Sequence, residues 1–176
     1  MVIERPNMQV YLLRHGISED QQVGKSDADR KLTQEGRRRL RETLRVAAQA
    51  EVKPSLILAS PLVRAVETAA IVRDVLRCSS EILQTKVLVP NAQPEQVWDE
   101  IRIHRDETEL LLVGHEPLFG QLAAHLLSAP ELRIDFKKGA LLRVDFESIG
   151  LTPHGTLRWF LTSKLAHEHA TISAKK

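Results

Sequence analysis

The chain of 176 residues contains one cysteine, Cys78. A single cysteine can form neither an internal disulfide nor a four-cysteine zinc site, and it is typical of a reducing compartment. Aromatic residues are also scarce, at 4% of the sequence, which argues against stacking platforms for single-stranded nucleic acid. The formal net charge of +2 gives no strong field that would attract a polyanion. We therefore expect no nucleic-acid partner.

Long hydrophobic runs are missing as well. No apolar stretch approaches the roughly 20 residues that cross a bilayer, and the opening Met-Val-Ile-Glu-Arg-Pro lacks the apolar core of a signal peptide. We expect a soluble cytoplasmic protein with no membrane partner. The sequence also lacks the P-loop and Rossmann glycine signatures and any carboxylate cluster suited to magnesium, so we expect no metal and no cofactor.

The composition that remains is that of a globular protein, 43% hydrophobic and 27% charged. A chain of this length falls within the usual size of one domain, so we expect residues 1–176 to form a single domain. Its core should cover about residues 8–162. The polar sequence from about Ala166 predicts a frayed C-terminal tail.

Strand-like runs alternate with helical patterns along the chain. The short apolar runs predicted as strands are residues 8–13, 56–59, 85–89 and 110–113. Residues 142–146 and 157–161 instead alternate apolar and polar side chains, which indicates a hairpin at a sheet edge. The order predicts an α/β fold, a three-layer α/β/α sandwich whose mostly parallel sheet carries an antiparallel edge hairpin.

Helix-start signals follow the predicted strands. Thr33 has the sequence context of a helix cap. Ser60 is predicted to cap the next helix, with Pro61 at its first position. Pro94 and Pro117 are each predicted to open a further helix in the same way.

The first predicted helix is rich in arginine: Arg37, Arg38, Arg39, Arg41 and Arg45. A solvated face explains these side chains, because Glu35 and Arg39 have the spacing of a helical ion pair. A basic docking surface for an acidic partner is the alternative interpretation.

Polar side chains gather where the predicted strands end. The first strand ends in Arg14-His15-Gly16, and His115 follows a later strand in the same way. Arg64 lies in the first turns of the helix after the second strand, where free N–H groups favour an anion. Parallel strands place their carboxyl ends at one edge, where open α/β sheets bind ligands. Because guanidinium groups suit phosphate and a neutral imidazole can act as a nucleophile, the sequence predicts a phosphate pocket there.

These motifs resemble those of a known family. They are Arg14-His15-Gly16 after the first strand, Ser60-Pro61 with Arg64 at the second, and Gly114-His115 near the fourth. In this order they resemble the histidine phosphatase superfamily, which has the phosphoglycerate mutase-like fold. The stretches 30–36, 60–69, 113–117 and 137–141 resemble more narrowly its SixA-type phosphohistidine phosphatase branch. The similarity covers roughly residues 8–162.

The resemblance implies roles for the residues of the pocket. His15 would be the nucleophile that becomes phosphorylated, and water would then release phosphate from it. Arg14, Arg64 and His115 would hold the phosphoryl oxygens, and Gly16 would also bind phosphate. Such a clamp would work without a metal ion.

The resemblance does not identify which residue would act as the general acid. Many superfamily members use a carboxylate to protonate the leaving oxygen, whereas the SixA-type branch manages without an obvious one. The candidates here are Glu19, Asp20, Glu95 and Glu116, and the sequence prefers none. A phosphohistidine substrate would need less help, because its P–N bond is labile.

Three functions stay open from the sequence. The first is a phosphatase for phosphohistidine on a signalling or phosphorelay protein, the second a small-molecule phosphomonoesterase of the same mechanism, and the third a non-catalytic phosphate-binding module. The short segment from Ser79 to His104 leaves little room for the lid of the larger mutases. An open pocket would admit a phosphorylated side chain of another protein, and it would also admit small phosphate esters. Ile17-Ser18-Glu19-Asp20 replaces the tryptophan–asparagine pair of the mutases, so mutase activity is disfavoured. A nucleophilic His15 argues against the third function.

Overall fold

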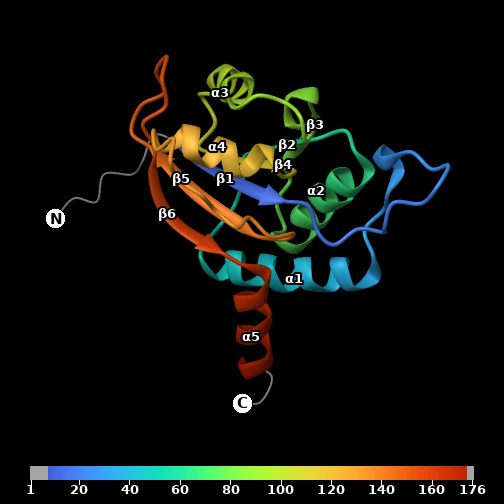
Figure 1. The fold of residues 1–176 in the computed structure, drawn as a ribbon. Coiled ribbons are helices and arrows are strands. Elements are labelled where there is room, and N and C mark those ends of the chain that lie inside the picture. Colours follow the sequence, from blue (N-terminus) through green and yellow to red (C-terminus); the bar gives the residue numbers. More distant parts are fainter. Residues whose placement is uncertain (1–7, 174–176) are drawn as a thin grey trace.

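The computed structural model describes residues 8–173, in which six strands form one mixed sheet of order β3-β2-β4-β1-β5-β6 (Figure 1). The parallel strands are β1 (Met8–Arg14), β2 (Leu56–Ala59), β3 (Glu81–Gln84) and β4 (Glu109–Gly114). The antiparallel strands are β5 (Leu141–Phe146) and β6 (Thr156–Leu161) at one edge. The predicted parallel sheet with an antiparallel edge hairpin is confirmed. Met1–Pro6, on which the signal-peptide expectation depends, lies outside the described residues.

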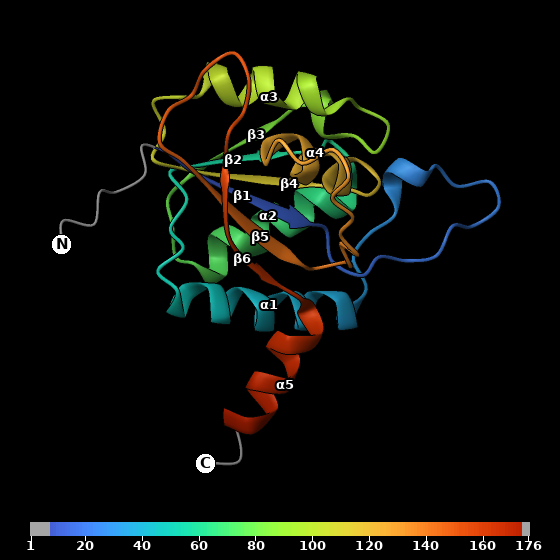
Figure 2. The ribbon, with the colours of Figure 1, turned by 60° about the vertical axis from the view of Figure 1, so that its left-hand side comes forward.

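Helices cover both faces of the sheet, as Figures 1 and 2 show. The helices α1 (Gln34–Gln49) and α2 (Val63–Val75) pack on one face. The helices α3 (Pro94–Ile103) and α4 (Leu118–Leu126) pack on the other. The three-layer α/β/α sandwich is therefore confirmed. No helix of residues 8–173 has the length and apolar character needed to cross a membrane.

The central strands are mostly apolar because both of their faces are covered. In β1, Val10 and Leu12 belong to the core under α3 and α4, whereas Tyr11 and Leu13 belong to the core under α1 and α2. Side chains of a strand alternate between faces, so a strand buried on both faces has a continuous apolar sequence. This is why the short runs could be identified as strands.

Several predicted boundaries were wrong by a few residues. Ser60 does not cap α2, whose N-cap is Leu62, and Pro117 is the N-cap of α4 rather than its first residue. The strand predicted from Thr85 to Val89 lies earlier, at β3. The Thr85 hydroxyl accepts a hydrogen bond from the Val87 backbone and starts the short 3-10 helix η2 (Lys86–Leu88), which ends the strand conformation.

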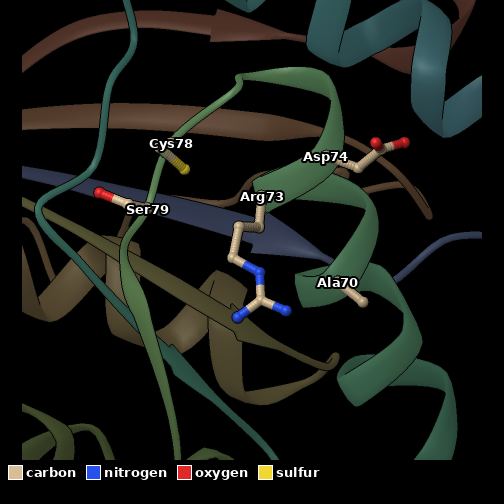
Figure 3. A pocket seen from close by; sticks show the side chains of 5 residues that line it. All are labelled: Ala70, Arg73, Asp74, Cys78 and Ser79. Atoms are coloured by element: carbon tan, nitrogen blue, oxygen red, sulfur yellow. The ribbon is translucent and has the colours of Figure 1, made fainter.

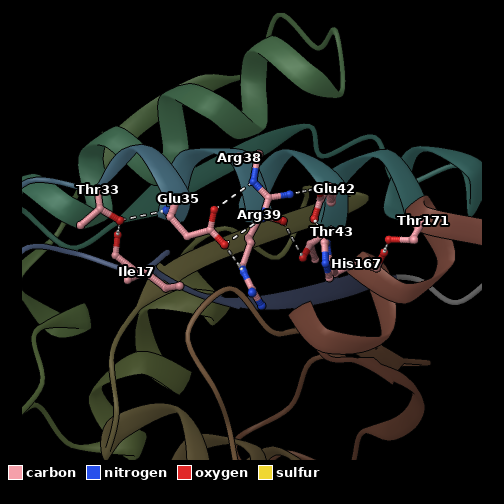
Figure 4. A network of polar contacts seen from close by, with 10 residues as sticks. Ile17, Thr33, Glu35, Arg38, Arg39, Glu42, Thr43, His167 and Thr171 are labelled. Carbon is pink, nitrogen blue, oxygen red and sulfur yellow. Dashed lines mark hydrogen bonds and ion pairs between the residues drawn. The ribbon is translucent and has the colours of Figure 1, made fainter. Parts of the chain in front are cut away.

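The C-terminal tail is not frayed where the structure describes it. Residues Ser163–Ser173 form α5, which lies against α1 (Figure 1). Ala166 is fully buried, and Nδ1 of His167 lies 2.9 Å from Glu42 on α1 (Figure 4). The expectation was wrong because a mostly polar helix can be held by one small buried side chain and one polar contact.

Four of the five arginines of α1, all except Arg45, are paired with carboxylates within residues 8–173. Arg38 contacts Glu35 and Glu42 on its own helix, and Arg39 contacts Glu35 (Figure 4). Other partners come from α2: Glu67 binds Arg37 and Asp74 binds Arg41. These pairs support a solvated, ion-paired face.

An open cavity of about 570 Å³ lies at the C-terminal end of α2 (Figure 3). It is lined by Ala70, Arg73, Asp74, Cys78 and Ser79. Arg64 lies at the opposite end of the same helix. The cavity therefore contains none of the predicted site residues.

Candidate active site

The two predicted site histidines lie side by side at the carboxyl edge of the sheet. Arg14 at the end of β1 pairs in register with Gly114 at the end of β4, and the backbone N–H of His15 donates to the Gly114 carbonyl at 3.1 Å. The rings of His15 and His115 are 5.0 Å apart between centroids. Both side chains are buried. The register of two parallel strands thus brings His15 and His115 together, as the sequence predicted.

Arg64 completes the group from the first turn of α2. Its Nε donates to Nε2 of His15 at 3.3 Å, and only 3% of the residue is exposed. Burial lowers the pKa of Arg64, but a guanidinium stays charged. A buried cation near a helix N-terminus is electrostatically unfavourable unless an anion joins it.

His15 is held as one neutral tautomer. Its Nδ1 lies 2.7 Å from the Gly16 carbonyl oxygen, which can only accept, so Nδ1 carries the hydrogen. Burial, followed by the neighbouring His115, lowers the pKa of His15 to about 2. The ring is therefore neutral near pH 7, and Nε2 keeps its lone pair. A neutral imidazole with one unprotonated nitrogen is what nucleophilic attack requires; here that nitrogen accepts the hydrogen bond from Arg64.

Gly16 positions His15 through its backbone. Its carbonyl binds the imidazole, and its N–H donates to the Thr68 hydroxyl at 3.2 Å. A Cβ at this position would lie 3.3 Å from the Gly36 carbonyl oxygen and from Leu32, so a larger residue would be crowded. Because both backbone polar groups of Gly16 are already bonded, its contact with phosphate stays a prediction.

His115 contacts Ser60, which the sequence predicted to be a helix cap. Its Nε2 lies 2.8 Å from the hydroxyl oxygen of Ser60, and both residues are buried. Burial, and then the charge of Arg64, lowers the pKa of His115 to about 3. The sequence suggested a helix cap at Ser60 because serine before proline is typical of one. Only the tertiary contact shows its other role.

Most of the buried polar side-chain atoms without a protein partner in the described part of the chain belong to Arg14, Arg30 and His115, and the charges of both arginines act on His115. Among residues 8–173 such atoms are Arg14 Nε, Ser18 Oγ, Arg30 Nε and His115 Nδ1. Buried polar groups are normally hydrogen-bonded, and exceptions often mark a missing ligand. Arg14 is otherwise anchored by a 2.7 Å bond to the Phe136 carbonyl. The unpaired donors, together with the buried cations, indicate a site for an anion.

Asp27 is a site residue that the sequence reasoning missed. One of its carboxylate oxygens lies 2.9 Å from Nη2 of Arg64, and the other lies 2.8 Å from Nη2 of Arg30. Burial alone would raise the pKa of Asp27, but hydrogen bonding to Arg64 and Arg30 outweighs it and lowers the pKa. Asp27 begins the short 3-10 helix η1 (Asp27–Asp29), capped by Ser26. A serine before an acidic turn indicates a capped local turn, but this pattern does not predict a contact with Arg64.

The four general-acid candidates lie in different surroundings. Glu116 is half-buried, burial raises its pKa, and its charge and that of Arg14 act on each other. Glu19 and Asp20 line an open cavity of about 280 Å³ between residues 19 and 31. Glu95 is exposed in the first turn of α3. Of the four, Glu116 is the one whose charge acts on Arg14, and its carboxylate accepts a hydrogen bond from the Gly120 backbone N–H at 2.8 Å.

The surroundings of the histidines are strongly cationic. The charges of Arg14, Arg30 and Arg64 all act on Lys138, whose pKa is lowered first by burial and then by Arg14 and Arg30. No group of three histidine, cysteine or carboxylate side chains suited to a metal is found within residues 8–173. The cationic side chains around the histidines favour an anionic ligand.

Sequence comparison identifies the family. Residues 10–86 match the model of the histidine phosphatase superfamily (branch 1). An uncharacterized protein of Picosynechococcus sp. is 32% identical over 128 residues, which cover 66% of this chain and 71% of that protein. The chain belongs to the histidine phosphatase superfamily. The Arg-His-Gly sequence at the end of β1 lies inside the matched residues.

Solved structures place this chain in the SixA-type branch of the superfamily. The protein histidine phosphatase SixA, in complex with tungstate, is 28% identical with a TM-score of 0.80, and the match covers 89% of this chain and 98% of that one. An α-ribazole phosphatase from Shigella flexneri has a TM-score of 0.68 at 17% identity, over 89% of this chain and 97% of that one. The second likeness shows the shared fold alone.

Proposed function

We propose that this protein is a phosphatase that works through a phosphohistidine intermediate on His15. The observation that carries the proposal is the hydrogen bonding of His15. Its Nδ1–H is fixed on Gly16, so the Nε2 lone pair is directed to the side where Arg64 lies. A nucleophile oriented beside a buried cation is suited to in-line attack on phosphorus.

The reaction has two steps. Nε2 of His15 first attacks the phosphorus atom, and the bond to the leaving group breaks on the opposite side. Arg14, Arg64 and His115 hold the phosphoryl oxygens and supply positive charge without a metal ion. Water then attacks phosphorus, the P–N bond breaks with its electron pair returning to Nε2, and dihydrogen phosphate leaves. Glu116 is the best-placed group to protonate a leaving oxygen, since burial raises its pKa.

We favour phosphohistidine on another protein, a signalling or phosphorelay partner, as the substrate. The segment that forms a lid in larger mutases is here used for β3, η2 and α3, whose Val97, Trp98 and Ile101 pack into the core of the sheet. It is therefore not available to roof the pocket. Asp27, which contacts the buried Arg64, is itself half exposed, so one end of this ion pair faces solvent where a partner protein can approach. The buried Cys78 fits action in a reducing cytoplasm.

Small phosphate esters are the alternative substrates, and a direct comparison tests the choice. Hydrolysis of a phosphohistidine-bearing phosphotransfer protein should exceed that of a panel of sugar and nucleotide phosphates in kcat/KM. A preference for an ester would overturn the choice of substrate without affecting the mechanism. Replacing His15 with Ala should lower kcat at least roughly thousandfold, whereas His125→Ala, at the far end of α4, should retain activity. Equal activity of the two variants, or loss of activity with a chelator, would contradict the mechanism.

A further inference from the structure

The contact between Ser60 and His115 bears on which ring nitrogen of His115 carries the hydrogen. Ser60 lies directly after β2, and His115 lies directly after the neighbouring strand β4. The Ser60 backbone N–H donates to the Val113 carbonyl at 2.9 Å, which fixes the serine beside this strand end. The hydroxyl oxygen is then 2.8 Å from Nε2 of His115.

The hydrogen bonds of the Ser60 hydroxyl give this contact a direction. The Leu62 backbone N–H donates to the Ser60 oxygen at 3.4 Å, so the hydroxyl already acts as an acceptor there. Ser60 is fully buried, and its own hydrogen needs an acceptor. Nε2 of His115 is the nitrogen within reach. If Nε2 carried a hydrogen instead, the buried hydroxyl hydrogen would be left unpaired.

The state of the other ring nitrogen follows. His115 is neutral near pH 7, because burial and then Arg64 lower its pKa to about 3. A neutral imidazole carries one hydrogen. With Nε2 accepting from Ser60, that hydrogen is on Nδ1, which is buried and has no protein partner. An unpaired Nδ1–H beside the cations of the site is a donor for an anion, whereas a lone pair there would repel one.

We propose that Ser60 is a positioning residue that donates to Nε2 of His115 and so keeps Nδ1 protonated as a phosphoryl-binding donor. Its consequence for turnover depends on the proposed phosphatase function. The protonation of the ring does not, and it can be measured alone.

Two-bond ¹H–¹⁵N NMR correlations of the histidine rings test the proposal at pH 7. In the unchanged protein, His115 should carry hydrogen on Nδ1 and none on Nε2. In Ser60→Ala this pattern should be lost or reversed, and tungstate should bind roughly tenfold more weakly. His15, held by Gly16, should keep its own pattern in both proteins.

Ser80→Ala is the matched control. Ser80 is also buried and donates to the Pro54 carbonyl, so its loss removes a similar hydrogen bond away from the site. It should lower the thermal midpoint while leaving the His115 signals and tungstate binding unchanged.

Three results would overturn the proposal. One is Nε2 protonation of His115 in the unchanged protein, which is informative even if Ser60→Ala does not fold. Another is an unchanged His115 pattern in Ser60→Ala. The third is equal loss of tungstate binding in the two serine variants. Failure of phosphate hydrolysis with the expected NMR pattern would contradict the proposed function and leave the role of Ser60 standing.

Discussion

The two site histidines have different partners, and the difference decides what each can do. Nδ1 of His15 donates to a carbonyl, which leaves Nε2 as a nucleophile next to Arg64. Nε2 of His115 contacts a hydroxyl, which leaves Nδ1 unpaired. In the proposed mechanism, identical residue types at equivalent strand ends would supply a nucleophile and a phosphoryl-binding donor. The hydrogen-bond partner, rather than the residue type, assigns the role.

We expect Asp27 to compete with a bound anion for Arg64. Replacing Asp27 with Asn removes the carboxylate charge 2.9 Å from Nη2 of Arg64. We expect tungstate to bind about threefold to tenfold more tightly, a modest gain because Asp27 is half exposed and screened by water. Isothermal titration at constant pH and salt measures the change.

Asp29→Asn is the control for this variant, since Asp29 is exposed and lies in the same 3-10 helix. Its affinity for tungstate should stay within twofold or so of the unchanged protein. Weaker binding in Asp27→Asn would show instead that Asp27 orients Arg64 for the anion.

The sequence predicted the site residues at strand ends but not those in loops. Arg14, His15 and His115 follow apolar runs whose β structure is evident, and parallel strands bring their ends together. Asp27 contacts Arg64 across 37 positions of sequence. No local pattern encodes such a contact. Ser60 does lie at the start of the turn before α2, but its hydroxyl contacts His115 instead of capping the helix as predicted.

The helices show the same division between local and tertiary causes. Thr33 caps α1 as predicted, with its hydroxyl accepting from the Gly36 backbone at 2.9 Å. That glycine is required by a close approach, because a Cβ would lie 2.0 Å from the Ile17 carbonyl oxygen. The cap could be predicted from local sequence, whereas the packing of α1 against the chain after Gly16 could not.

The attachment of α5 to α1 gives an element-level prediction. Replacing the fully buried Ala166 with Asp places a charge without a partner in this contact and should lower the thermal midpoint by about 5–10 °C. His169→Asp, at an exposed position of the same helix, should change the midpoint by less than about 2 °C. Differential scanning calorimetry compares the two. Equal midpoints would show that α5 does not contribute to stability.

The fold as a whole holds two neutral histidines in its interior, which makes its stability depend on pH. The pKa of each histidine is 6.5 in the unfolded chain, whereas burial lowers it to about 2 for His15 and to about 3 for His115. Between pH 6.5 and pH 3 the unfolded chain therefore binds more protons than the folded protein. The free energy of unfolding must fall as the pH is lowered through this window.

Urea unfolding at pH 6.5 and pH 5 measures the effect. The two histidines together should account for a loss of about 3 kcal/mol between these pH values. A His15→Asn, His115→Asn double variant should lose correspondingly less over the same interval. Equal losses in the two proteins would mean that the histidines titrate normally in the folded state.

The most direct measurement of the proposed chemistry is the location of the phosphoryl group during turnover. The protein is mixed with phosphoramidate, quenched in base, and digested for tandem mass spectrometry. We expect a base-stable, acid-labile phosphoryl group on His15 and none in His15→Ala. A phosphoryl group found on His115 or another residue, or phosphate released by the unchanged protein with no adduct at all, would contradict the mechanism.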